Sequence, residues 1–184
     1  GMFNVLNNNK ESAYIASEYT LTDGYFNSSQ NFNRLNIFGK YTANVTDTDK
    51  IGVTLSHFTS DWDASGQIPQ RAVNSGLITG FGAIDDTEGG STSRTNALVN
   101  YDKIISENAS IKNKIYYSKY NFELFSNFTF FLDDPVNGDQ IKQKETRNIF
   151  GFNSDYHQDF TQLDGSLSAG ISLRNDQSFH NELS

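Results

Sequence analysis

Apolar and polar residues alternate with a period of two along most of this chain. Between residues 35 and 45, the odd-numbered positions are mostly apolar and the even-numbered positions are mostly polar. Successive side chains of a β-strand point to opposite faces, so this pattern predicts strands with one apolar face and one polar face. Applied to the whole chain, it predicts about seven strands, at residues 12–20, 34–45, 50–59, 94–104, 109–123, 146–157 and 163–174.

The connections between the predicted strands alternate strictly between short and long. The short turns fall near residues 46–49, 106–108 and 161–162. The long polar stretches cover residues 23–33, 60–92 and 126–145. Transmembrane β-barrels have short turns on one side of the membrane and long loops on the other, whereas a soluble Greek-key sandwich has no reason to alternate in this way. We therefore predict an all-β fold, an antiparallel up-and-down meander that forms part of a transmembrane β-barrel.

The composition fits a sheet with one wet face. Hydrophobic residues make up only 36% of the chain and the mean hydropathy is −0.56, yet aromatic residues reach 14%. A soluble core of this size uses more aliphatic residues, and a disordered chain has few aromatics. Aromatic residues favour strands in general, but those near predicted strand ends favour interfacial girdles: Tyr25, Phe26, Phe58, Trp62, Tyr101, Tyr120, Phe122 and Tyr156.

Charge and missing motifs exclude several classes of function. The formal net charge is −8, whereas a nucleic-acid partner requires a basic surface. The chain has no cysteine, which excludes disulfides and cysteine-based metal sites. His57, His157 and His180 are too far apart for a metal-ligand motif, and no nucleophile, P-loop or dinucleotide motif occurs. We predict no catalytic residue, no enzymatic activity and no cofactor.

Four residues of the second long polar stretch and its flanks are candidate ligand contacts: Trp62, Asp63, Arg71 and Arg94. An amphipathic indole at a loop root suits a ligand platform or an interface belt. A guanidinium can pair with an anionic ligand through two parallel hydrogen bonds. The alternative is that these residues brace the loop, with Arg71 or Arg94 paired to Asp63 or Glu88.

Two acidic clusters are candidate metal sites, because carboxylate oxygens are the ligands that Ca²⁺ prefers. Asp85, Asp86 and Glu88 form the first cluster, beside two glycines. Asp133, Asp134 and Asp139 form the second. A charged loop tip is the alternative interpretation of the first cluster. Turn chemistry is the alternative for the second, because Asn137-Gly138 is a strong hairpin-turn dipeptide.

The long polar stretches also resemble TonB-dependent outer-membrane receptors. The resemblance is carried by residues 62–73 and 81–94, which include Trp62-Asp63-Ala64-Ser65-Gly66 and Asp85-Asp86-Thr87-Glu88-Gly89-Gly90, and by residues 127–141. A weaker match is Thr22-Asp23-Gly24-Tyr25. The resemblance implies a barrel of about 22 strands with a plug in its lumen, of which residues 1–184 are a single segment. It implies a place in the Gram-negative outer membrane, in contact with lipid.

The resemblance also implies a function for the parent protein. The parent would bind a scarce nutrient and import it with energy delivered by the TonB complex, which contacts the plug region. A ferric siderophore is the first expected ligand, and a cobalamin-like or carbohydrate ligand is the alternative. Both chain ends are expected to be cuts in a longer protein, and the isolated segment is expected to curl or self-associate and not to transport. The competing hypothesis is a soluble all-β module that binds carbohydrate or another ligand.

Overall fold

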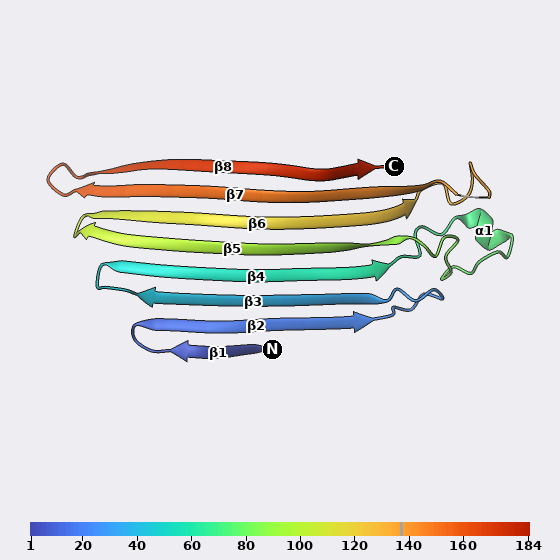
Figure 1. Cartoon of the computed structure of the whole chain (residues 1–184), viewed down its shortest axis with the longest axis horizontal. Coiled ribbons are helices and arrows are strands. Elements are labelled where there is room, and N and C mark those ends of the chain that lie inside the picture. Colours follow the sequence, from blue (N-terminus) through green and yellow to red (C-terminus); the bar gives the residue numbers. More distant parts are fainter. Residues whose placement is uncertain (137) are drawn as a thin grey trace.

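The computed structural model describes residues 1–136 and 138–184, and within them eight strands form a single antiparallel sheet (Figure 1). Each strand is hydrogen-bonded to its neighbours in sequence, and the sheet is not closed. The strands are β1 (Met2–Asn7), β2 (Glu11–Thr22), β3 (Phe32–Asn44), β4 (Asp49–Asp63), β5 (Gly89–Ser106), β6 (Ala109–Asn127), β7 (Gln140–Phe160) and β8 (Gly165–Leu183). The predicted all-β up-and-down meander is therefore confirmed.

The structure adds one strand that was not predicted and lengthens the predicted ones. β1 was not predicted, because the register shift between Asn4 and Leu6 breaks the period of two in this short strand. β7 begins at Gln140 instead of residue 146, and β8 continues to Leu183 instead of residue 174. These extensions are rich in polar residues, and pairing with the neighbouring strand determines their conformation.

All long connections lie at one end of the sheet and all short turns lie at the other (Figure 1). The longest connection, between β4 and β5, contains the helix α1 (Gln70–Asn74). The predicted alternation of short and long connections is thus confirmed. No helix in the described parts of the chain is long and apolar enough to cross a membrane.

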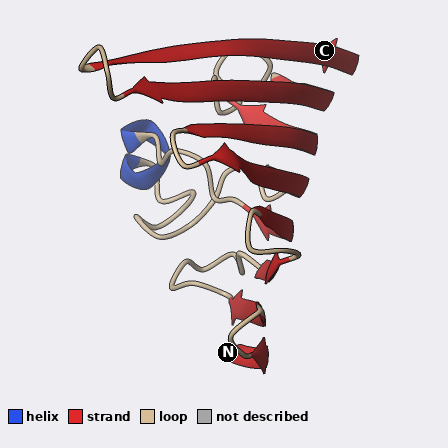
Figure 2. Cartoon of the chain, turned by 90° about the vertical axis from the view of Figure 1, so that its left-hand side faces the viewer, coloured by secondary structure: helices blue, strands red, loops and turns tan. Residues whose placement is uncertain are grey.

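The continuous register places the predicted apolar residues on one face, here called the apolar face. Tyr41, Val53 and Val99 are direct neighbours across β3, β4 and β5, and the same row continues to Leu173 in β8. The opposite, polar face carries lysine, asparagine, serine and threonine side chains in the half nearer the short turns. The sheet is curved, as the end-on view shows (Figure 2). Seven residues expected to share a face do so: Leu35, Ile37, Val53, Leu55, Val99, Ile115 and Leu167.

The apolar side chains form a band that is slanted relative to the rows of paired residues. In β3 the band runs from Leu35 to Ala43, and in β8 it runs from Leu167 to Leu173. The row of directly paired residues that starts at Leu35 in β3 ends at Phe179 in β8, which is about six residues beyond Leu173, where the band ends in β8. Between Leu173 and Phe179 the same face of β8 carries Asn175 and Gln177. The band therefore shifts by about one residue per strand.

The expected aromatic girdle at the long-loop end is wrong for four residues. Phe58, Trp62, Tyr120 and Phe122 occupy even-numbered positions of β4 and β6, and the register assigns these positions to the polar face. Tyr25 and Phe26 stack on each other in the β2–β3 loop, with ring centroids 4.8 Å apart, and each also contacts Phe81. Tyr101 and Tyr156, near the short turns, do lie on the apolar face.

Candidate functional site

One row of the polar face alternates aromatic rings and guanidinium groups across four strands. Phe58 in β4 pairs with Arg94 in β5, Arg94 with Tyr120 in β6, and Tyr120 with Arg147 in β7. We call these four residues the arginine–aromatic row. The guanidinium carbon of Arg94 lies 5.1 Å from the centroid of the Tyr120 ring. Tyr120 in turn stacks on Phe122, with 6.3 Å between centroids and 14° between planes.

The two arginines of this row differ in their partners. Arg147 forms ion pairs with Glu145 at 2.5 Å and with Asp176 at 3.7 Å. Within residues 1–136 and 138–184, Arg94 has no carboxylate within ion-pair distance, and its guanidinium lies over the Tyr120 ring. Arg94 is also exposed. The row therefore presents one positive charge that is not neutralised within the described chain.

The next row toward the short turns is internally satisfied. The Asn96 amide donates to the Ser56 hydroxyl at 3.0 Å, and the Ser118 hydroxyl donates to the Asn96 carbonyl oxygen at 2.8 Å. These cross-strand hydrogen bonds join the polar side chains of that row to one another. The arginine–aromatic row, in contrast, retains unused guanidinium donors on Arg94.

Two of the four predicted ligand contacts share the polar face. Trp62 and Arg94 lie on the adjacent strands β4 and β5, and the Trp62 ring covers Gly90, where an added Cβ would lie 3.0 Å from Cζ2. Asp63 points to the opposite face, since it follows Trp62 in the strand, and its carboxylate accepts a hydrogen bond from Asn31 at 2.6 Å. Asp63 is therefore not brought together with Trp62.

Arg71 braces the loops, but with partners that differ from the expected carboxylates. Its guanidinium donates to the carbonyl oxygens of Thr129, at 3.0 Å, and Phe130. The expected pairing of Arg71 or Arg94 with Asp63 or Glu88 is wrong, because Arg71 reaches the β6–β7 loop and Arg94 lies over Tyr120. Arg71 thus ties the β4–β5 loop to the β6–β7 loop.

The same two loops meet at a polar cluster, which we call the loop crown: Asp85, Thr87, Glu88 and Asn127. Asp85, Glu88 and Asn127 are buried, whereas Thr87 is exposed. Asn127 is 1% exposed and donates from its amide to Asp85 at 3.0 Å. Its carbonyl oxygen accepts from the backbone N–H of Phe130 at 2.8 Å. Asp85 also accepts hydrogen bonds from the side chain and backbone of Thr87. One asparagine therefore satisfies polar groups from both loops.

The ionisation of the two crown carboxyl groups is shifted in opposite directions. Burial opposes ionisation of Asp85, but hydrogen bonds from Thr87 and Asn127 outweigh it and lower the pKa of Asp85. Burial raises the pKa of Glu88, and the nearby charge of Asp85 adds to the rise against a backbone hydrogen bond from Asn127. Among the described residues, Glu88 Oε1 has no hydrogen-bond partner. The crown therefore favours ionisation of Asp85 and opposes ionisation of Glu88.

The two predicted metal clusters have other arrangements. Asp85 and Glu88 are buried and Asp86 is exposed, and no group of three acidic or histidine side chains in the described residues could hold a metal ion. In the second cluster, Asp139 accepts from Thr129 at 2.7 Å and Asp134 accepts from the Val136 backbone at 3.0 Å. Asp134 thus makes the predicted turn-type contact; in the Asn137-Gly138 dipeptide, Asn137 lies outside the described residues.

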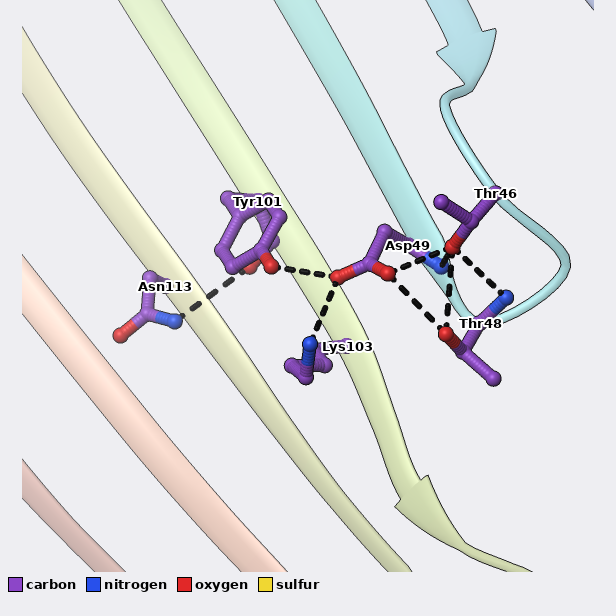
Figure 3. A network of polar contacts seen from close by, with 6 residues as sticks. All are labelled: Thr46, Thr48, Asp49, Tyr101, Lys103 and Asn113. Atoms are coloured by element: carbon purple, nitrogen blue, oxygen red, sulfur yellow. Dashed lines mark hydrogen bonds and ion pairs between the residues drawn. The ribbon is translucent and has the colours of Figure 1, made fainter.

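A further polar network anchors the short turn between β3 and β4 (Figure 3). The Asp49 carboxylate accepts hydrogen bonds from Thr46 at 2.5 Å, Tyr101 at 2.5 Å and Lys103 at 3.2 Å. Hydrogen bonds from Thr46, Tyr101, Lys103 and Thr48, in that order, lower the pKa of Asp49. Asp49 precedes Ile51, the first apolar residue of β4 on the apolar face, and its paired residue Lys103 follows Tyr101 in β5, so this charged pair lies beside the short-turn edge of the band.

Sequence analysis missed Phe58, Tyr120 and Arg147 as one constellation with Arg94, and it missed Asn127. A usable signal exists for the first three. They occupy polar-face positions of strands that the alternation already predicts. The length of each short turn determines the register of the two strands it joins, and the register of the strands places the three residues in one row. Asn127 has no such signal, because it contacts loop residues whose path is irregular.

No protein-family model, no curated protein and no solved structure matches this chain. Any inference about the function of the arginine–aromatic row and the loop crown therefore rests on the fold and the geometry described above.

Proposed function

We propose that this chain is a segment of a membrane-spanning β-barrel of the TonB-dependent receptor type, located in the outer membrane of a Gram-negative bacterium. The observation that carries the proposal is the slanted apolar band on one face of a meander whose long loops all lie at one end. On this proposal the apolar face contacts lipid and the polar face lines the lumen. The long loops then face the outside of the cell.

The slant of the band supports this geometry quantitatively. A shift of one residue is about 3.3 Å along a strand, and neighbouring strands are about 4.8 Å apart. Strands with this shift must tilt by roughly 35° for the band to lie level, which is within the tilt range of membrane barrels. A face adapted to a soluble partner has no requirement to lie level around a barrel axis, so the slant favours a bilayer.

Exposure of the band supports a lipid contact over the soluble alternative. Leu55 is 56% exposed, Ile115 58% and Leu173 59%. A soluble module would leave these aliphatic side chains in water as one contiguous surface, which costs solubility and promotes association. In a bilayer the same exposure is favourable, because hydrocarbon replaces water around each side chain.

The two sheet edges define how the segment fits into its parent. β1 and β8 each have one unpaired edge, and unpaired edges bind further strands readily. In the parent, strands on either side continue the barrel. When the segment is isolated, we expect these edges to pair with other copies of the chain.

The receptor part of the proposal concerns the parent protein. The parent binds a scarce nutrient, with a ferric siderophore as the first candidate, and imports it through the TonB complex acting on a plug. The segment contributes lumen-facing side chains and two long loops joined by Arg71 and the loop crown. Such joined loops provide an ordered outer surface on which a ligand can bind.

Single-cysteine labelling tests the membrane assignment, because the chain has no native cysteine. Val99→Cys and Asn100→Cys place an environment-sensitive fluorophore on opposite faces of β5, and Ser93→Cys places it on the apolar face beyond the band. In phosphatidylcholine vesicles we expect blue-shifted emission, and quenching by lipid-borne quenchers, for the label at position 99 only. Water-like emission at all three positions would refute the barrel assignment.

A further inference from the structure

We infer that the arginine–aromatic row binds an anionic ligand with a flat aromatic surface, such as an aryl carboxylate, with Arg94 as the anion contact. This inference rests on the proposed function and deepens it, because it names a ligand class for the lumen-facing surface. The row consists of Phe58, Arg94, Tyr120 and Arg147 on four adjacent strands.

The charge of Arg94 is available to a ligand. Arg147, the other guanidinium of the row, is held by Glu145 and Asp176. Arg94 has only the Tyr120 ring as a partner in the described chain. A cation–π contact uses the face of the planar guanidinium and leaves the N–H groups at its edge free. A carboxylate can therefore accept two parallel hydrogen bonds from Arg94 without displacing an existing partner.

The neighbours of Arg94 determine the shape of the ligand. Phe58 lies on one side of Arg94 and Tyr120 on the other, in adjacent strands about 4.8 Å apart. Phe122 extends the aromatic surface beyond Tyr120. A ring attached to the bound carboxylate meets these aromatic side chains and stacks on them, whereas a puckered aliphatic ring makes poorer contact with their faces.

The arrangement is held rigidly enough to act as a site. β4, β5, β6 and β7 pair without a register shift from Phe58 through Tyr120 to Arg147. The hydrogen-bonded Ser56, Asn96 and Ser118 lie directly below the row. Side chains on paired strands are positioned more precisely than side chains on loops.

Titration of the full chain in zwitterionic detergent tests the inference, with benzoate as the probe and benzyl alcohol and cyclohexanecarboxylate as comparison compounds. Amide resonances of Thr95 and Tyr120 report binding at the row. We expect benzoate to bind more tightly than both comparison compounds. R94Q should weaken benzoate binding by roughly tenfold or more, the effect of removing a charge-assisted hydrogen-bond pair. K114Q removes the same charge from the polar face nearer the short turns and should leave binding unchanged.

The inference would be overturned by equal binding of benzyl alcohol, by equal binding of cyclohexanecarboxylate, or by equal weakening in R94Q and K114Q. Unchanged circular dichroism of R94Q ensures that lost binding is not lost folding. Absent benzoate binding in a chain whose label at position 99 is buried in lipid refutes the ligand site and leaves the barrel assignment standing. Benzoate binding with a water-exposed label at position 99 refutes the barrel assignment instead.

Discussion

Asn127→Ala is expected to open the loop crown while leaving the sheet intact. Asn127 is almost fully buried, and it supplies the amide hydrogen bond to Asp85 and accepts the backbone N–H of Phe130. Alanine removes both interactions and leaves the Phe130 N–H and one Asp85 oxygen without these partners. The sheet hydrogen bonds of β6 and β7 are independent of the side chain.

The expected magnitude follows from these two contacts. A hydrogen bond to a charged group contributes about 1.5–3 kcal/mol, and a buried polar group left unsatisfied costs about 1–3 kcal/mol. Allowing for water that enters the opened site, we expect the closed crown to lose about 3 kcal/mol relative to the open loops. This corresponds to roughly a hundredfold increase in the population of the open form.

Limited trypsin digestion measures this population, because Arg71 is a cleavage site whose guanidinium is engaged by the β6–β7 loop in the closed crown. We expect cleavage after Arg71 to accelerate by roughly a hundredfold in Asn127→Ala when cleavage tracks the open population. Asn153→Ala is the matched control, since Asn153 loses only a 2.7 Å hydrogen bond from Ser172 on the sheet. Equal cleavage rates in the wild type, the control and Asn127→Ala would refute the role of Asn127.

Two further predictions concern the same crown. Gly66→Ala should destabilise the closed loops by about 1–3 kcal/mol, because Gly66 has φ +62° and its added Cβ would overlap the Glu88 carboxylate. Gly76→Ala is the control: Gly76 has φ +75° but open space around it, so this variant should show only the cost of the backbone conformation. Equal tryptic cleavage rates for the two variants would contradict the contact with Glu88. Burial raises the pKa of Glu88. The contribution of Glu88 to the stability of the crown is therefore fully present below the usual carboxyl pKa of 4.5 and is lost as pH rises through the raised value. We therefore expect loop cleavage to rise in the wild type as pH increases from 4.5, and to rise less in Glu88→Gln. An identical pH dependence in both proteins would exclude Glu88 as the group responsible.

The sequence alone determined the secondary structure of the sheet and the connectivity of its strands. Alternation at positions such as Leu35, Ile37 and Tyr41 reports the two faces of a strand directly, because the side-chain period of a strand is two. The spacing of short and long connections then predicts an antiparallel meander. Where alternation fails, as at the bulge in β1 and the polar ends of β7 and β8, cross-strand pairing determined the structure and the prediction fell short.

Only the tertiary structure decided which polar residues meet. The arginine–aromatic row depends on the register of four strands, and a slip of one residue in any strand would move its member to the other face. The loop crown depends on the Asp85–Asn127 contact, which joins residues 42 positions apart. Such contacts have no periodic signature along the chain, because irregular loops take their shape from the partners they reach. The sequence therefore specifies the sheet through a local repeating pattern, whereas the sites form from long-range contacts that folding alone brings together.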